Sequence, residues 1–197
     1  MSAPQGPDPA DAELVRRARG GDEQAFARLM QRHERRVYNL AYRMLGNAED
    51  ARDATQDAFL SCFRHLDRFR GESQFATWLH RIAINACYDS LRRRHDTKSL
   101  DDEPFEIHPA PDHADQAAAA TDVHRALQAV PQEFRAALIM HELQDMPLEE
   151  IAAALEVPVG TVKSRLHRGR VALGRALAAS APGEPRPLHS PSKPPTP

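Results

Sequence analysis

Residues 148–170 read LEEIAAALEVPVGTVKSRLHRGR, and this stretch decides the fold of the second half of the chain. Apolar residues three and four positions apart predict a short helix over 148–155 and a second helix from 159 onward. The turn between them, Glu156-Val157-Pro158, lacks the glycine that many such turns contain. Proline is tolerated at a helix start, so Pro158 marks where the second helix begins. This layout is that of a helix-turn-helix.

The second of these helices carries a basic and hydroxyl-bearing face. Four bases fall within residues 163–170 and no acid interrupts them. A solvated basic face on a surface helix is one interpretation, but the preceding short helix and the placement of Pro158 favour a helix that enters the major groove of DNA. The candidate DNA-contacting residues are Thr161, Lys163, Ser164, Arg165, His167, Arg168 and Arg170.

Composition divides the chain into two folded units, a linker and two tails. Residues 122–179 form the second unit, with further helices expected over 123–129 and 132–143. Residues 96–121 contain three prolines, and their charged residues are mostly acids. This composition predicts an acidic, flexible linker that spans about 85 Å when fully extended. The Pro-rich, apolar-poor segments 1–11 and 180–197 are expected to be disordered tails.

The first unit, residues 12–95, shows helical periodicity and no strand pattern. One helix is expected over 22–45 and ends at Gly46. Asn47 is a candidate cap for a second helix that runs to about residue 66, and Ser73 for a third that runs to residues 92–94. We therefore predict an all-α protein made of two small helical domains.

Two faces of the first unit have alternative interpretations. The third helix mixes aromatic rings with bases, which suits stacking on single-stranded nucleic acid, but Phe75, Trp78 and Ile82 also fit a core stripe. The second helix carries an acidic and polar face, which is either solvated or a surface for a protein partner. One side of this helix is expected to hold Ala51, Ala54, Ala58, Phe59 and Phe63.

Composition also excludes several classes of protein. The net charge is -2, no run of 18 apolar residues exists, and the N-terminus lacks a basic-then-apolar signal, so we expect neither membrane insertion nor secretion. Cys62 and Cys87 form no CxxC pair, no two histidines lie three or four positions apart, and neither GxSxG nor HExxH occurs. We expect no enzyme activity, no cofactor, no metal and a cytoplasmic location.

Three stretches in series resemble one known family, the extracytoplasmic-function sigma factors of bacterial RNA polymerase. The stretches are DATQDAFL at 53–60, FRGESQFATWLHRIAINA at 69–86 and PVGTVKSRLHRGR at 158–170. The resemblance covers about 12–95 and 122–178 and implies sigma region 2 in the first unit and sigma region 4 in the second. The Pro-rich segment after Ala179 lies outside the family pattern, and we assign it no role.

The resemblance implies a role for each surface. The face that docks on the clamp helices of the largest polymerase subunit matches Asp53, Gln56, Asp57, Phe59 and Leu60. Loop 69–74 matches the loop that captures a flipped base of the -10 element, and Lys163, Ser164, Arg165 and Arg168 match the face that reads the -35 element. The acidic linker matches a segment that threads toward the RNA exit channel. The candidate -10 residues are Phe69, Arg70, Gly71, Glu72, Ser73, Phe75, Trp78, Arg81 and Asn85.

Together these features predict a subunit that binds core RNA polymerase and directs initiation at specific promoters. The family is commonly held inactive by an anti-sigma factor, so an anti-sigma partner is expected as well. The rival hypothesis is a free-standing helix-turn-helix regulator, which would bind duplex DNA tightly without polymerase. The promoter sequence, the anti-sigma factor and the packing of the two units against each other are not readable from the residues.

Overall fold

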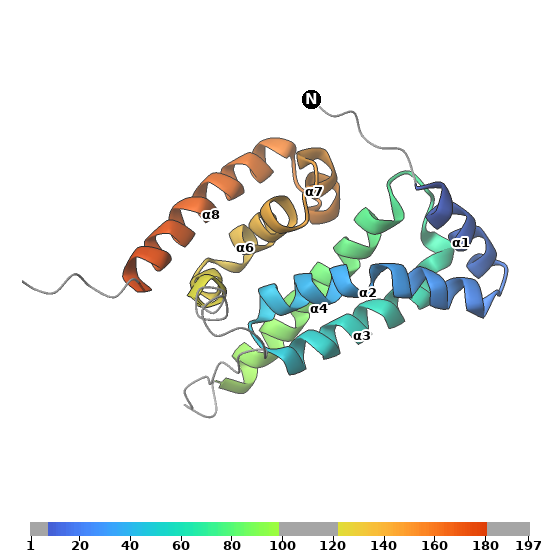
Figure 1. Cartoon of the computed structure of the whole chain (residues 1–197), viewed down its shortest axis with the longest axis horizontal. Coiled ribbons are helices and arrows are strands. Elements are labelled where there is room, and N and C mark those ends of the chain that lie inside the picture. Colours follow the sequence, from blue (N-terminus) through green and yellow to red (C-terminus); the bar gives the residue numbers. More distant parts are fainter. Residues whose placement is uncertain (1–7, 99–121, 181–197) are drawn as a thin grey trace, which may run out of the picture.

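The computed structural model describes residues 8–98 and 122–180, and every regular element in those two ranges is helical (Figure 1). The first unit contains α1 (Pro9–Arg19), α2 (Glu23–Leu45), α3 (Ala48–His65), the 3-10 turn η1 (Leu66–Arg68) and α4 (Phe75–Lys98). The second contains a helical segment at 122–128, α6 (Gln132–Leu138), the π-helical turn η2 (Ile139–Leu143), α7 (Leu148–Leu155) and α8 (Val159–Ser180). The predicted all-α fold is confirmed.

Capping side chains explain where the central helices begin. Asp22 Oδ1 accepts from the Ala25 amide at 3.0 Å, and Asn47 Oδ1 accepts from the Asp50 amide at 2.7 Å, which confirms the predicted cap of α3. Gly46 ends α2 in the left-handed conformation at φ 87°, as a C-terminal glycine commonly does. The expected cap at Ser73 is wrong. Helix α4 begins at Phe75, and the Ser73 hydroxyl instead donates to the Gln74 carbonyl at 3.3 Å.

Helix α1 corrects the predicted boundary of the N-terminal tail. Residues 1–11 were expected to be disordered, but the helix begins at Pro9, and the Asp8 carboxylate accepts from the Ala10 amide at 2.9 Å. Asp11 is buried and lies 2.8 Å from His33 Nε2 on α2. The first unit therefore starts several residues earlier than the composition indicates. Residues 1–7 lie outside the described ranges.

The expected linker 96–121 and the expected C-terminal tail 180–197 lie mostly outside the described residues. Helix α4 continues to Lys98, so the first three positions of the expected linker 96–121 are helical. Helix α8 ends at Ser180, one position into the expected C-terminal tail. The acidic segment 99–121 and the tail 181–197 are not described, so the predictions made for them are untested.

The two units share one hydrophobic core. Helix α2 contributes Val37, Leu40 and Met44, which are fully buried, and the second unit contributes fully buried residues such as Ile139 and Ile151 to the same cluster. Helix α7 packs on α4, while α6 and η2 pack on α2 (Figure 1). This packing, which the sequence left open, places the second unit along one side of the first. None of the helices described has the length and apolar character that crossing a membrane requires.

Candidate nucleic-acid interface

The helix-turn-helix is present with the predicted bounds of its first helix. Helix α7 ends at Leu155, and Glu156 takes the left-handed conformation at φ 53° that a glycine often supplies. The Val157 amide then donates to the Ala152 carbonyl at 3.1 Å, and α8 starts directly after Pro158. The helical spacing of Val159, Val162 and Leu166 predicts that they face inward. Val162 and Leu166 are buried, and Val159 is half-buried against the core.

The outward face of α8 carries the predicted cations. Lys163, Ser164, His167, Arg168 and Arg170 are exposed, and Thr161 is half-buried. The Ser164 hydroxyl donates to the Thr161 carbonyl at 2.9 Å. The Arg168 guanidinium lies 5.9 Å from the centre of the Phe134 ring, within the range of a cation–π contact. This face combines cationic and hydroxyl groups on one rigid helix, as a groove-binding surface requires.

Two of the predicted arginines on α8 have distinct surroundings. Arg170 Nη2 lies 2.6 Å from Glu142 Oε1 of η2, and this hydrogen bond lowers the pKa of the Glu142 carboxyl. Arg165 is half-buried and lines a hollow of about 650 Å³ between α4 and the second unit, together with Asn85 and Tyr88. Arg165 therefore faces the first unit, whereas Lys163, Arg168 and Arg170 are exposed.

The aromatic residues around the start of α4 form one cluster. The Phe69 ring centre lies 5.7 Å from that of Phe75 and 5.3 Å from that of Trp78. The exposed fraction is 8% for Phe69 and 3% for Phe75, so both belong to the core. The core-stripe interpretation is confirmed for Phe75, whereas Ile82 is half-buried and Phe69 was not part of that stripe. Trp78 is half-buried and is the member of the cluster that reaches the surface.

The polar part of loop 69–74 is exposed next to α1. Arg70, Gly71 and Glu72 are exposed, Ser73 is half-buried, and Gly71 has a φ of 73°. A hollow of about 360 Å³ separates this loop from α1, with Phe69 and Phe75 in its lining. Arg19 of α1 donates to the Asp67 carbonyl at 2.9 Å and to the Phe69 carbonyl at 3.3 Å, and so holds the base of the loop.

Arg19 was not among the predicted site residues, because no helix was predicted for this segment. Asp8 followed by Pro9, with Ala18 three and four positions after Val15 and Leu14, is the signal that would have revealed α1.

Two predicted polar residues of α4 lie on the side that faces the second unit or the surface beside it. Arg81 Nη2 lies 2.6 Å from Glu156 Oε1 of the helix-turn-helix. Asn85 is exposed, and with Ile82 and Asp57 it lines a hollow of about 340 Å³ between α3 and α4. Of the strand-contact candidates of α4, Arg81 is thus in contact with the duplex-reading unit.

Helix α3 presents a mixed acidic and apolar face. Asp53, Gln56 and Asp57 are exposed, Leu60 is 45% exposed, and Phe59 is half-buried. Phe59, Leu60 and Gln56 also line a hollow of about 370 Å³ between α2 and α3. Exposed apolar side chains rimmed by polar ones are typical of protein-docking surfaces.

Phe63 corrects one detail of the sequence analysis. It was expected on the same side of its helix as Ala51, Ala54 and Ala58. Those alanines are buried, but Phe63 is 59% exposed and packs edge-on against Phe26 of α2, with ring centres 4.9 Å apart. Because Phe63 follows Leu60 by three positions, it extends the exposed apolar stripe of α3 by one helical turn. We therefore add Phe63 to the candidate protein-docking residues.

Comparison with known proteins assigns both units. Residues 29–97 match the family model for Sigma-70 region 2, and residues 120–173 match that for Sigma-70, region 4. The chain is 42% identical over 170 residues to the ECF RNA polymerase sigma factor SigM of Mycobacterium tuberculosis strain H37Rv, with 85% of each chain covered. It is 37% identical to the RNA polymerase sigma-H factor of Pseudomonas aeruginosa, covering 85% of this chain and 93% of the relative.

Two solved structures match most of the chain. CnrH in complex with the cytosolic domain of CnrY matches with a TM-score of 0.68 at 26% identity, covering 87% of this chain and 99% of that one. The sigma factor RpoE of Bartonella quintana, in complex with the anti-sigma factor NepR, matches with a TM-score of 0.65 at 26% identity, covering 79% and 98%.

Proposed function

Because the chain belongs to the extracytoplasmic-function sigma factors of bacterial RNA polymerase, we propose a separate task for each surface described above. The α3 face, with Asp53, Gln56, Asp57, Phe59 and Leu60, docks on the clamp helices of the largest polymerase subunit. The exposed face of α8 reads the -35 element as duplex. Loop 69–74 and α4 hold the melted -10 strand. Polymerase supplies the chemistry of RNA synthesis, and this chain acts with it in the cytoplasm.

One observation carries this proposal: the acidic, apolar face of α3 and the cationic face of α8 lie on different units and are both exposed. A surface of cations and hydroxyls suits phosphates and base edges, whereas a surface of acids and apolar groups is repelled by DNA and suits a protein. Polymerase and duplex can therefore bind the same chain together, and the tether between the units raises the effective concentration of each at its own site.

Opening the -10 element requires a base to leave the duplex stack. Unstacking and unpairing cost about a few kcal/mol, which contacts with the extruded base must offset. Trp78 and Arg81 supply an aromatic surface and a cation on α4, while the buried rings of Phe69 and Phe75 give loop 69–74 a rigid base. Hollows of about 360 Å³ beside this loop and about 340 Å³ beside Asn85 could receive the extruded base.

Two further parts of the proposal concern regulation. An anti-sigma factor is proposed as a partner, since both solved relatives described above were captured with a second protein, named an anti-sigma factor in one case. The acidic segment 99–121 is proposed to enter the RNA exit channel of polymerase, where its negative charge stands in for RNA.

The decisive experiment is run-off transcription with purified core polymerase on a library of upstream genomic fragments. We expect initiation from a small set of fragments that share two short elements, and the shared elements give the promoter sequence. Core polymerase alone is the control. Failure to obtain initiation from any template would refute the proposed function.

The division of labour between the units predicts opposite effects for two variants. Lys163→Ala removes an exposed cation from α8 and should weaken binding to the -35 duplex about tenfold, while binding to core polymerase is unchanged. The double variant Asp53→Ala/Gln56→Ala should weaken polymerase binding and leave the α8 surface intact. Gel-filtration assembly with core polymerase and anisotropy with labelled duplex measure the two effects. Loss of polymerase binding in Lys163→Ala would contradict the assignment.

A further inference from the structure

Helix α2 carries a row of arginines along one face. At about 3.6 residues per turn, an arc of about 100° of the helix circumference contains Arg28, Arg32, Arg35, Arg36 and Arg43. The first four of these residues are exposed and the last is half-buried. The row is about 22 Å long, at about 1.5 Å of rise per residue. We call these five side chains the α2 stripe.

The α2 stripe differs from an ordinary solvated helix face. Such a face commonly alternates acids and bases, whereas like charges four positions apart destabilise a helix. Arg32 follows Arg28 by four positions and precedes Arg36 by four. The two acids of α2, Glu23 and Glu34, lie on the opposite side of the helix. The stripe therefore concentrates positive charge at a cost to the helix, and an anionic partner would relieve that cost.

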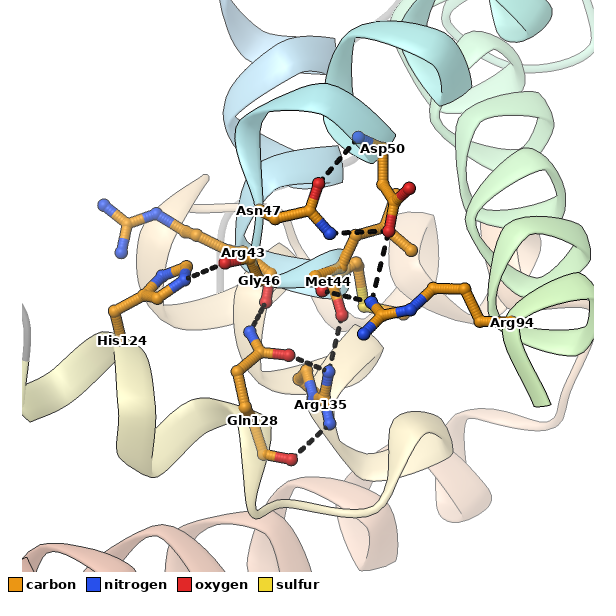
Figure 2. Close-up of polar contacts among 10 residues, drawn as sticks. Arg43, Met44, Gly46, Asn47, Asp50, Arg94, His124, Gln128 and Arg135 are labelled. Atoms are coloured by element: carbon orange, nitrogen blue, oxygen red, sulfur yellow. Dashed lines mark hydrogen bonds and ion pairs between the residues drawn. The ribbon is translucent and has the colours of Figure 1, made fainter. Parts of the chain in front are cut away.

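Most of the guanidinium groups of the α2 stripe are available to such a partner. Within residues 8–98 and 122–180, no ion pair is formed by Arg28, Arg35, Arg36 or Arg43. At the end of the stripe, the Arg43 carbonyl accepts from Gln128 Nε2 at 2.9 Å, and Arg135 of α6 donates to the next carbonyl. Figure 2 shows the Arg43 side chain pointing away from these contacts. The second unit thus holds the backbone here and leaves the charged end of Arg43 free.

Arg32 connects the α2 stripe to the loop proposed to capture the flipped base. Its guanidinium lies 2.9 Å from the Asp8 carboxylate and 3.0 Å from the Asp11 carboxylate. Both acids line the hollow of about 360 Å³ between α1 and loop 69–74. The stripe therefore begins beside this hollow and runs along α2 toward the second unit.

We infer that the α2 stripe holds the phosphates of the single promoter strand where this strand continues beyond the base captured at loop 69–74. The inference rests on the proposed function of that loop. Arginine suits this occupant, because its planar fork of donors matches the oxygens of a phosphate. Contacts of this kind position a strand without reading its sequence. The stripe consists of cations alone, which separates it from the acidic and apolar face of α3 proposed for polymerase.

Strand binding by the reconstituted holoenzyme tests this inference. The short probe is the labelled non-template strand of the -10 element from a promoter obtained by run-off transcription, and the long probe adds about ten nucleotides on each side. Arg28→Gln/Arg35→Gln removes two exposed cations of the stripe. We expect this variant to bind the long probe about tenfold more weakly than the parent and the short probe equally well. Its plot of log affinity against log salt should be shallower by about 1.4, since each phosphate contact on a single strand contributes about 0.7.

Two further variants serve as matched controls. Arg28→Lys/Arg35→Lys keeps both charges and should retain most of the affinity for the long probe, because Lys also binds phosphate. Arg125→Gln/Arg175→Gln removes two exposed arginines of the second unit and should bind both probes as the parent does. All four substituted positions are exposed, and circular dichroism checks that each variant is folded.

Several outcomes would overturn the inference. One is equal affinity of the parent and Arg28→Gln/Arg35→Gln for the long probe, and another is an equal loss in Arg125→Gln/Arg175→Gln, which would make net charge the cause. Loss of assembly with core polymerase would assign the stripe to polymerase instead, and tighter strand binding would assign it to an acidic competitor of DNA.

Failure of the proposed function would look different. In that case the parent would bind the short probe no better than a short probe of scrambled sequence. The α2 stripe does not read sequence, so the comparison of the parent with Arg28→Gln/Arg35→Gln on the long probe would still decide the inference.

Discussion

Asp11 is a buried acid whose importance depends on a residue far away in the sequence. Its carboxylate lies 2.8 Å from His33 Nε2 and 3.0 Å from Arg32 Nε, and both Asp11 and His33 are buried. Removing one partner of a buried pair leaves the other without compensation. We predict that Asp11→Ala lowers the free energy of unfolding by about 3 kcal/mol, measured by urea denaturation followed by circular dichroism.

Glu13 on the same helix provides the control for this prediction. Its carboxylate pairs with Arg16, but both side chains are largely exposed, and pairs of this kind contribute little to stability. Glu13→Ala should therefore leave the urea midpoint unchanged. If Asp11→Ala and Glu13→Ala lower the free energy of unfolding equally, the loss is caused by removing a negative charge from α1 and not by removing the buried contact.

Residue-scale predictions from the sequence succeeded where the deciding neighbour is close in the chain. Asn47 caps its helix by accepting from an amide three positions away. The burial of Val162 and Leu166 follows from their helical spacing. Asp11 was missed because its partner His33 is 22 positions away. The exposure of Phe63 was also missed, since spacing places a side chain on a helix face but does not say whether another helix covers that face.

Two of the three glycines in helix α8 have opposite surroundings. A Cβ at Gly169 would lie 2.9 Å from Leu138 Cγ of the buried core, so this glycine allows α8 to pack closely on α6. At Gly174 a Cβ would meet nothing within 4 Å. We predict that Gly169→Ala destabilises the protein by about 1 to 3 kcal/mol through overpacking, whereas Gly174→Ala stabilises it by about 0.5 to 1 kcal/mol. Thermal unfolding of both variants measures the difference, and equal shifts would contradict the role of Gly169.

At the scale of elements, periodic segments were predicted well and irregular ones were not. Helices α2 and α7 lie within one residue of their predicted bounds, because their apolar spacing is regular and their ends carry capping or breaking residues. Helix α1 was missed because it begins with Pro9 and follows Pro4 and Pro7, so its first turn resembles part of a Pro-rich tail. The π-helical turn Ile139–Leu143 was expected as ordinary helix, since no sequence signal separated the two.

At the scale of the whole molecule, the sequence indicated two units but not their contact. Charge segregation and the Pro-rich linker define each unit, since both are local properties. The contact depends on Arg135 meeting the Met44 carbonyl, 91 positions apart, and on Glu156 meeting Arg81. Long side chains such as these suit either solvent or a buried interface, so their partners became identifiable only in the folded chain.

The stability of the whole molecule should peak between about pH 6.5 and pH 9. Burial lowers the pKa of His80, so below about pH 6.5 the unfolded chain binds a proton that the folded chain does not, and stability falls with falling pH. Burial raises the pKa of Cys62 and Cys87 to about 12. Above about pH 9 the unfolded chain therefore loses two protons that the folded chain keeps, and stability falls again.

The alkaline side of this profile gives the sharper prediction. Each thiol should contribute a loss of up to about 1.4 kcal/mol per pH unit above pH 9. Urea unfolding at pH 7.5, 9 and 10 measures how the free energy of unfolding changes with pH. The Cys62→Ala/Cys87→Ala variant also loses packing, but that loss is the same at each pH and does not change the slope. That variant should show a shallower decline, with a remainder above about pH 10 from Tyr42 and Tyr88, whose pKa values burial also raises. An unchanged slope would mean that the two thiols meet solvent in the folded chain, and the continuous core described above would then be wrong at α3 and α4.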